Sequence, residues 1–304
     1  MAYLHSDREQ FRDAIDLAYE QTGVMVQAIE KDYYVTMLLR LLAQRMPYIV
    51  FKGGTSLSKC HKVIRRFSED IDITIDTLLS QGQKKKIKQA IVESAEELGM
   101  TIENLDETRS RRDYNRYVIA YDSVIPMASD ALKAAVLLET AYTAVSFPTV
   151  LLPVHSYIGD MMEQEAPDAI EEYNLNPFEM KVQGIDRTLA DKVFAVCDYY
   201  LQGKVAKHSR HLYDIYKLLP LVPQDENFKE LVKEVRAVRE QSVICPSALP
   251  EANVPELLEK IIKGKAYKQD YDSLTTQLLE ENVPYDTVIA TLKKVAESSI
   301  FENN

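Results

Sequence analysis

The most informative part of this 304-residue chain is residues 48–76, which read YIVFKGGTSLSKCHKVIRRFSEDIDITID. The apolar run at 48–51 predicts a short buried strand, and the Gly53–Gly54 pair predicts a tight turn after it. A short helix is then expected to reach about Arg65. From Asp70 to Asp76 apolar residues alternate with polar ones, which predicts a strand with one apolar and one polar face.

Two carboxylates on this second strand indicate metal chemistry. Asp70 and Asp72 stand two residues apart, so their side chains are expected on one face of the strand, with Cα atoms about 7 Å apart. Their repulsion has to be relieved by solvent, by basic partners or by a metal ion. Mg²⁺ binds through one or two carboxylates together with substrate phosphates. The alternative is the solvated polar face of an ordinary antiparallel strand.

The glycine pair offers a place for phosphate groups. Only nine glycines occur in the chain, and Gly53 and Gly54 are the only two that are adjacent. Glycines between a strand and a helix let backbone N–H groups approach an anion closely. Thr55 and Ser56 add hydroxyl groups, and Lys59 could neutralise phosphates or simply be solvated. The alternative is a plain tight turn, and the segment lacks the Gly-Lys-Ser/Thr of a Walker A loop.

The rest of the chain divides into an α/β amino-terminal half and a helical carboxy-terminal half. We expect one boundary near residue 147, which separates domain 1–147 from domain 148–304. The first helix is expected to begin at a capping box of Ser6 and Glu9. Further helices and strands are predicted by apolar periodicity. The helices are 26–44, 84–98, 186–202 and 210–219, and the strands are 117–121 and 134–140, joined by a loop at 126–130.

Composition limits the classes of protein that fit. The 36 basic and 47 acidic residues give a formal charge of −11, which argues against a protein that coats DNA indiscriminately. Three widely spaced cysteines predict neither a disulfide framework nor a zinc site. No apolar run approaches the roughly 20 residues that span a bilayer, and the amino terminus lacks an apolar signal core. We therefore expect a cytoplasmic protein with no membrane partner.

One basic segment contains tyrosines and could contact RNA. It comprises Arg109, Arg111, Arg112 and Arg116, with Tyr114 and Tyr117 among and after them. Such a segment can hold a phosphate backbone and stack on bases, and its binding should weaken as salt is added. A solvated loop before a strand is the alternative. Because basic residues are concentrated here, the acidic net charge does not exclude an RNA acceptor.

Several ordered motifs together resemble a known family. Phe51–Lys59 followed by Arg66–Ile73 is similar to the signature of the AbiEii/AbiGii toxin family of nucleotidyltransferases, within the DNA polymerase β-like nucleotidyltransferase superfamily. The resemblance runs from about Ile29 to Leu219. Departures are Ser56, where alanine is common, and His211, where a charged residue is frequent. The further similar segments are Ile29–Val35, the lysine motif Arg187–Lys192 and the late arginine/aspartate motif Arg210–Tyr216.

The resemblance implies a fold and a set of site residues. The fold would be α+β, with a small mixed-sheet nucleotidyltransferase core, flanking helices and a mostly helical C-terminal domain that carries the lysine and late aspartate motifs. The cofactor would be Mg²⁺, or Mn²⁺ in its place, held by Asp70 and Asp72. The implied catalytic residues are Asp70, Asp72, Lys192, Asp214 and Glu139, the last as a third carboxylate or as a solvated strand-end residue. The implied nucleotide contacts are Gly53, Gly54, Thr55, Ser56, Lys59, Arg66, Ser68 and Lys192.

The resemblance also implies a reaction and its partners. The enzyme would transfer a nucleoside monophosphate from a nucleoside triphosphate to a tRNA or another RNA, as the toxin of a bacterial toxin–antitoxin or phage-defence pair with a cognate antitoxin. Lys192 would contact nucleotide phosphates. Asp214 would orient Lys192, help the acceptor lose its proton, or merely pair with Arg210. The alternatives are the same chemistry on a small-molecule or protein acceptor, and a non-catalytic interaction protein on the same fold.

Overall fold

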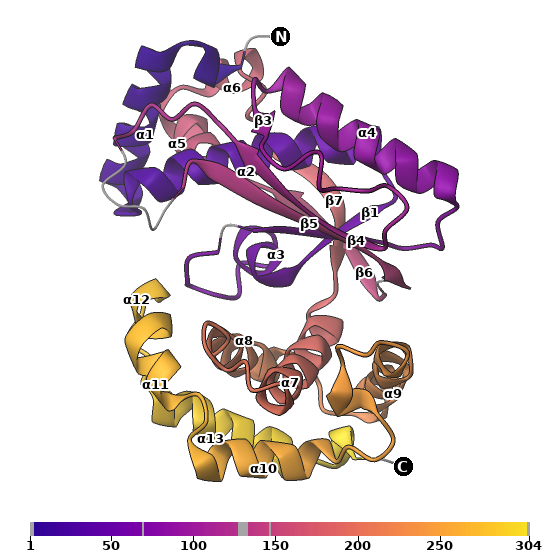
Figure 1. The fold of residues 1–304 in the computed structure, drawn as a ribbon. Helices are drawn as coiled ribbons and strands as arrows, with labels where there is room; N and C mark the ends of the chain where they lie inside the picture. The colour runs from indigo at the N-terminus through magenta and orange to yellow at the C-terminus, as the bar shows by residue number, and fades with distance from the viewer. Residues whose placement is uncertain (1–2, 69, 127–132, 146, 303–304) are drawn as a thin grey trace. The chain divides into compact units, whose positions relative to one another are not determined.

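The computed structural model describes residues 3–68, 70–126, 133–145 and 147–302, and the chain forms two compact units (Figure 1). The sheet unit comprises Met1–Cys60 and Ser68–Val182, and the helical unit comprises His61–Phe67 and Gln183–Asn304. The short segment 61–67, which includes the first two residues of the second sequence motif, therefore belongs to the helical unit.

The sheet unit contains a mixed seven-stranded sheet with the strand order β3-β4-β5-β2-β1-β7-β6. β1 (Ile49–Lys52) runs antiparallel to β2 (Ile71–Ile75) and parallel to β7 (Phe178–Gln183), and β2 runs parallel to β5 (Ala135–Val145). The two motif-bearing strands are thus neighbours inside the sheet. The other strands are β3 (Thr101–Ile102), β4 (Tyr114–Ala120) and β6 (Thr149–Val154).

One face of this sheet is covered by a continuous apolar core. Ile71, Ile73 and Ile75 of β2 are almost fully buried in it. Since side chains alternate along a strand, Asp72 lies on the opposite face. The long helix α2 is apolar around most of its circumference and is buried against α1, α4, α5 and β5. The helices of this unit are α1 (Arg8–Thr22), α2 (Val26–Arg45), α3 (Gly53–Lys59), α4 (Gln81–Glu97), α5 (Tyr157–Glu165) and α6 (Pro167–Glu172), with a 3-10 turn at Leu4–Ser6.

The helical unit is built around α7, which packs against α8, α9 and α10. Its longer helices are α7 (Ile185–Leu201), α8 (Arg210–Leu218), α9 (Glu226–Glu240), α10 (Val254–Gly264) and α13 (Tyr285–Ala296). Shorter elements are α11 (Lys268–Asp270), a π turn at Tyr271–Thr275, α12 (Thr276–Leu278) and 3-10 turns at Leu219–Leu221, Pro246–Ala248 and Ser299–Phe301. In the described part of the chain, none of the helices is long and apolar enough to cross a membrane.

Backbone hydrogen bonds anchor the segment 61–67 in the helical unit. Phe67 N donates to Leu278 O at 2.9 Å, and Glu280 N donates to Arg65 O at 3.0 Å. An isolated antiparallel bridge between Arg66 and Leu279 lies between these two bonds. The segment that carries Arg66 is therefore fixed by main-chain contacts as well as by its side chains.

The α+β fold with a mixed sheet, flanking helices and a helical carboxy-terminal region is confirmed. The four predicted helices at 26–44, 84–98, 186–202 and 210–219 correspond to α2, α4, α7 and α8, with ends that differ by at most three residues. These segments have long apolar stripes with helical spacing, which is the most dependable signal of local structure.

Four local predictions differ from the structure. The short helix that was expected to reach about Arg65 is α3, which ends at Lys59. α1 begins at Arg8, and the side chain of Asp7 accepts from the backbone N–H groups of Glu9 and Gln10, so the predicted Ser6–Glu9 capping box is wrong. β2 begins at Ile71, one residue later than predicted, so Asp70 precedes the strand. β6 and β7 are strands that lie after residue 147, in the half of the chain that was expected to be helical.

The position of β7 accounts for the extent of the sheet unit. Because β7 pairs with β1, residues up to Val182 belong to the sheet unit, well beyond the boundary that we expected near residue 147. The division into domains itself stays a prediction. The expected loop at 126–130 lies, apart from Pro126, outside the described residues, as does Glu69 in the second motif.

Candidate functional site

The glycine pair and the carboxylate strand touch each other in the sheet unit. Gly53 has a φ of +79°, a conformation that side chains disfavour. A Cβ atom at Gly53 would lie 2.0 Å from Oδ2 and 2.9 Å from Cγ of Asp72, so the carboxylate occupies the space that any other residue would need. Gly53 therefore allows Asp72 to lie directly against the backbone at the start of α3.

Hydroxyl groups hold this turn in shape. Ser56 Oγ donates to Gly53 O at 2.9 Å, and the hydroxyl oxygens of Thr55 and Ser68 lie 2.9 Å apart in a hydrogen bond. Thr55 and Ser56 are buried. The N-cap residue of α3, Lys52, makes no side-chain cap, and the first two residues of the helix are Gly53 and Gly54. The nucleotide contacts expected for these residues stay predictions.

Asp70 carries a buried oxygen that lacks a partner. Its Oδ1 atom is buried, and it has no hydrogen-bond partner among the residues that the structure describes. A buried polar atom without a partner is costly, and a carboxylate oxygen is the donor that Mg²⁺ prefers. Asp70 and Asp72 therefore fit a divalent cation that is completed by phosphate oxygens. Within the described ranges, no group of three or more His, Cys, Asp and Glu side chains is gathered closely enough to hold a metal.

Glu139 lies directly beside Asp72 on the neighbouring strand. The register pairs Lys52 with Asp72 across β1 and β2, and Asp72 with Glu139 across β2 and β5. Glu139 in turn faces Arg116 of β4, whose Nε lies 3.7 Å from Glu139 Oε1. Paired residues point to the same face, so this face carries a row of charges in the order positive, negative, negative, positive. The role of Glu139 as a third carboxylate stays a prediction.

Lys59 is engaged inside the sheet unit. Its Nζ donates to Asp32 Oδ1 at 2.5 Å, to Thr36 Oγ1 at 2.7 Å and to His155 O at 2.6 Å. The side chain is only 4% exposed. An ammonium group has three N–H donors, and all three are used. This arrangement favours a structural role for Lys59, joining α3 to α2, over the nucleotide contact that we expected.

A second cluster of charged motif residues lies within the helical unit. The Arg66 guanidinium donates to both carboxylate oxygens of Asp214, at 2.7 and 2.9 Å. Lys192 Nζ lies 2.8 Å from Asp214 Oδ2 and 3.2 Å from His211 Nδ1. Asp214 is completely buried. Two of the three Lys192 donors are thus assigned, and the third has no partner among the residues that the structure describes.

The surroundings of this cluster shift its pKa values. Burial raises the pKa of Asp214, but Arg66 and Lys192 outweigh that effect and hold it well below its usual range. Burial, reinforced by the nearby Lys192, lowers the pKa of His211 well below its usual value, so His211 is neutral and can accept from Lys192 through Nδ1. A carboxylate with such a low pKa is a poor proton acceptor. The orienting role is therefore favoured for Asp214.

The four candidate RNA-contact arginines lie on or before β4 and are all exposed. Asn115 shapes the loop that carries Arg109, because its Oδ1 accepts from Arg109 N at 2.8 Å and its Nδ2 donates to Arg109 O at 3.1 Å. Arg112 Nη1 donates to Glu107 O at 3.1 Å. The loop is thus held by specific hydrogen bonds.

Two residues with clear roles were not singled out from the sequence. Asp32 accepts from Lys59 and from Tyr157 N, and the charged run Glu30–Asp32 near the start of the largely apolar helix α2 was a signal that could have revealed it. Asn115 is buried near the start of β4, directly after a polar run, where no pattern distinguishes it from a solvated residue. Both act through contacts with segments that only folding brings near.

Comparisons with known proteins agree with these motifs. A family model described as "Nucleotidyl transferase AbiEii toxin, Type IV TA system" matches residues 36–291. Among solved structures, MenT4, a nucleotidyltransferase toxin from Mycobacterium tuberculosis H37Rv, is similar with a TM-score of 0.53 and 17% identity, over 93% of this chain and 88% of that chain. This likeness supports the fold alone, and none of the curated proteins matches. Because the family model covers most of the sequence, the chain belongs to the AbiEii family of nucleotidyltransferase toxins of type IV toxin–antitoxin systems.

Proposed function

We propose that this nucleotidyltransferase toxin transfers a nucleoside monophosphate from a nucleoside triphosphate to an RNA hydroxyl with the help of Mg²⁺. The observation that carries the proposal is the contact between Gly53 and Asp72, which places the expected phosphate turn and an expected metal ligand side by side. The adjacent carboxylate of Glu139 supports it, since two neighbouring acids on one sheet face are suited to a cation.

The proposed metal ligands are Asp70 and Asp72. When bound there, Mg²⁺, or Mn²⁺ in its place, would supply neutralisation of the triphosphate charge and polarisation of the acceptor hydroxyl. The unpartnered Oδ1 of Asp70 supports this assignment, because a cation would satisfy it. Glu139 is the proposed third carboxylate, and it is already paired loosely with Arg116.

The proposed phosphate contacts come from backbone and side chains. Gly53 and Gly54 carry no side chains that would keep a phosphate from the backbone at the start of α3, where the N-cap residue Lys52 makes no side-chain cap. Lys192 would donate its remaining N–H to a phosphate oxygen, while Asp214 and His211 hold the other two. Arg66 acts through Asp214 and is a positioning residue. The acceptor oxygen would attack the α-phosphorus in line, pyrophosphate would leave, and the acceptor proton would be released.

A transfer assay tests this function. The purified chain is incubated with each labelled nucleoside triphosphate, Mg²⁺ and total tRNA, and Asp70→Asn serves as the inactive control. Label on RNA in the wild type alone supports the proposal, whereas label on a small molecule or a protein would assign a different acceptor. If neither protein labels any acceptor, the enzymatic assignment of these residues fails.

Biological roles follow from the same assignment. We expect the chain to slow growth when it is expressed, and we expect Asp72→Asn or Lys192→Ala to restore growth. A cognate antitoxin is the proposed partner, and a cytoplasmic location is consistent with Cys60, Cys197 and Cys245, which are buried and form no disulfide in the structure as described. Equal toxicity of the wild type and these variants would contradict a catalytic toxin.

A further inference from the structure

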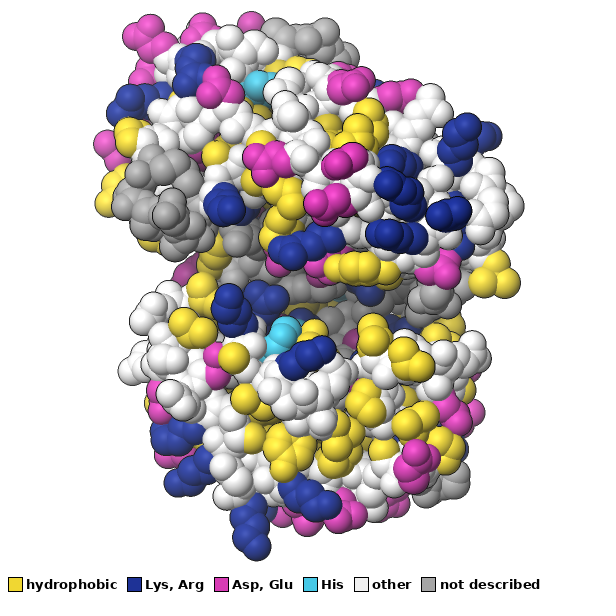
Figure 2. Space-filling model, viewed as in Figure 1, with side chains coloured by type: hydrophobic (Ala, Val, Ile, Leu, Met, Phe, Trp, Pro, Cys, Tyr) yellow, Lys and Arg dark blue, Asp and Glu magenta, His cyan; other side chains and the backbone are white. Residues whose placement is uncertain are grey.

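A basic surface lies on the sheet unit, along the first half of α4 and the loop before β4. Residues 84–88 contain four lysines and no acid, and residues 109–116 contain four arginines and one acid. Figure 2 shows Lys and Arg side chains gathered in the region that α4 occupies in Figure 1. In a chain whose formal charge is −11, this concentration does not follow from the overall composition.

Direct contacts join the helix and the loop into one surface. Lys84 forms an ion pair with Asp113, and Lys88 Nζ donates to Thr108 O at 2.9 Å. The buried Asn115 holds the backbone of the same loop at Arg109. Cations from two segments some twenty residues apart are therefore presented together, on a loop whose shape is already set.

Several of these cations are available to a ligand. Lys85, Lys86 and Arg111 are exposed, and in the described part of the chain none of them has an acidic partner. Elsewhere on the surface most exposed lysines with contacts pair with an acid one helical turn away, as Lys260 does with Glu256. The basic surface is thus suited to a partner that brings its own negative charges.

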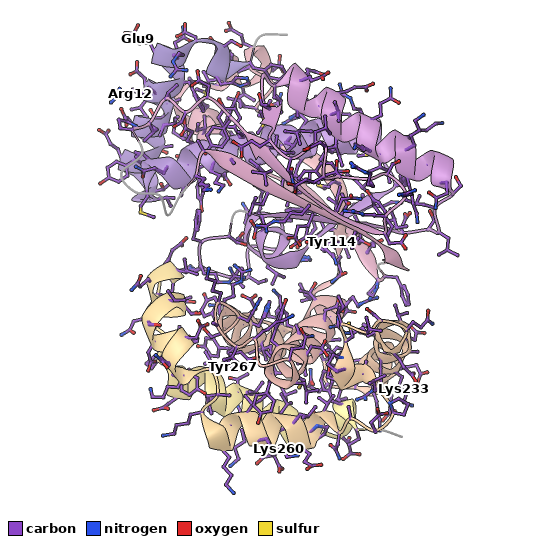
Figure 3. The ribbon with its side chains drawn as sticks, viewed as in Figure 1. Glu9, Arg12, Tyr114, Lys233, Lys260 and Tyr267 are labelled. Atoms are coloured by element: carbon purple, nitrogen blue, oxygen red, sulfur yellow. The ribbon has the colours of Figure 1, made fainter. Side chains whose placement is uncertain are left out.

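The basic surface continues toward the carboxylates that we assign to the reaction. On β4, Arg116 faces Glu139, and Tyr114 forms a hydrogen bond to the same carboxylate. Tyr114 is 52% exposed, and Figure 3 shows it in the sheet unit. An exposed aromatic ring beside cations is the arrangement that stacks on unpaired bases. An acidic protein would satisfy the lysines, but it would have no use for a stacking ring next to Glu139 and Asp72.

We propose that this basic surface binds the phosphate backbone of the RNA acceptor, and that Arg116 and Tyr114 receive its reacting end beside Glu139 and Asp72. The proposal rests on the proposed function, because it takes the acceptor to be RNA. The residues of the surface are Lys84, Lys85, Lys86, Lys88, Arg109, Arg111 and Arg112. Contacts to phosphates carry no base information, so this surface positions the RNA without reading its sequence.

Salt-dependent binding tests the proposal without any chemistry. A labelled RNA hairpin with a single-stranded 3′ end is titrated with the full chain at several salt concentrations, in the absence of nucleotide. The variant Lys85→Ala/Lys86→Ala/Arg111→Ala is expected to bind at least tenfold more weakly at low salt, and to lose about 2 from the slope of log affinity against log salt. The matched control neutralises three exposed lysines of the helical unit, Lys233, Lys260 and Lys293, two of which are labelled in Figure 3. It is expected to keep the wild-type slope.

The ring of Tyr114 is tested separately. Tyr114→Ala should raise the Kd for the hairpin roughly tenfold, whereas Tyr114→Phe should keep the wild-type Kd, because stacking needs the ring and not the hydroxyl. An equal loss in both variants would show that the hydrogen bond to Glu139, and not stacking, explains the effect, and it would overturn this part of the proposal.

Further outcomes separate this proposal from the proposed function. Asp72→Asn should bind the hairpin with the full salt slope, although it should transfer nothing. If the wild type transfers label to RNA while the triple variant keeps its affinity and slope, the basic surface is wrong and the function stands. If the triple variant loses its slope while no transfer is seen, the surface stands and the function fails. The wild type could instead bind a polyglutamate peptide as tightly as the hairpin, and the triple variant could lose affinity for both equally. That result would assign an acidic protein partner and overturn the RNA assignment.

Discussion

The carboxylates of the helical unit and those of the sheet unit differ in the partners of their oxygen atoms. In the helical unit, Asp214 is fully buried, and both of its oxygens are paired with Arg66, with Lys192 on one of them. In the sheet unit, Asp70 keeps a buried oxygen without a partner, and Asp72 lies beside Glu139. A charge that is satisfied inside the protein holds another group in place, whereas one that is left unsatisfied is prepared to bind a cation.

Removing the satisfied charge should give the largest effect on stability. Asp214→Ala leaves the Arg66 guanidinium and the Lys192 ammonium buried without a counter-charge, so we expect the free energy of unfolding to fall by about 3–5 kcal/mol. Urea denaturation followed by circular dichroism measures it. The control Asp272→Ala breaks an exposed pair with Lys268 and should cost less than about 0.5 kcal/mol. Equal losses in the two variants would contradict a buried positioning cluster.

Neutralising a proposed metal ligand of the sheet unit should instead affect catalysis. Asp72→Asn keeps the shape of the side chain but removes the charge that would hold the cation, so kcat/KM for transfer is expected to fall about 10²–10³-fold, or about 3–4 kcal/mol. The Tm should change little, because the site is only partly buried. Asp16→Asn, an exposed position on α1, is the matched control with wild-type activity. If the free energy of unfolding of Asp72→Asn fell by as much as its transition-state stabilisation, Asp72 would be a structural carboxylate like Asp214. That result would contradict the difference between the two units.

The glycine contact can be separated from ordinary backbone strain. Gly53→Ala places a methyl group on the Asp72 carboxylate and should destabilise the chain by about 1–3 kcal/mol while it also impairs transfer. Gly23 has a similar φ of +69° at the end of α1, but a Cβ there would meet nothing within 4 Å. Gly23→Ala should therefore show the strain alone and keep full activity. Thermal unfolding and the transfer assay on both variants check this, and equal activity would count against the contact with Asp72.

A smaller effect should appear in the pH dependence of stability. The pKa of His211 is lowered in the folded state, so its contribution to stability is complete above about pH 6.5 and is lost as the pH falls, because the unfolded chain then binds the proton more readily. His211→Asn keeps an acceptor for Lys192 but cannot titrate. Between pH 7.5 and 5.5 the wild type should lose more stability than the variant, by at most about 1.4 kcal/mol per pH unit. Parallel pH profiles would show that His211 is not neutral and buried beside Lys192.

Much of the fold followed from local patterns. The apolar stripes of α2, α4, α7 and α8 predicted these helices nearly to their ends, because the helical period is written into the sequence. β6 and β7 were missed, since segments of only six residues have no comparable periodic signal. The capping residue of α1 was misjudged by one position, because Ser6 and Asp7 are both good caps and the 3-10 turn before the helix decides between them.

The candidate site was anticipated in part, and its unexpected features are all long-range. Gly53 and Asp72 were singled out separately, but their contact depends on the pairing of β1 with β2. Lys59 was expected either to neutralise phosphates or to be solvated, and its burial depends on Asp32 and on the carbonyl of His155.

The family motifs, the helical periodicity and the concentrations of basic residues are properties of the chain, which is why the sequence suffices to identify a nucleotidyltransferase toxin. Which charges are satisfied is a property of the fold. Arg66 and Asp214 are 148 residues apart and pair only because the segment 61–67 packs within the helical unit. Whether a charged side chain is buried and which groups it contacts depend on such distant neighbours. These contacts distinguish the residues that position other side chains from the residues that bind a ligand.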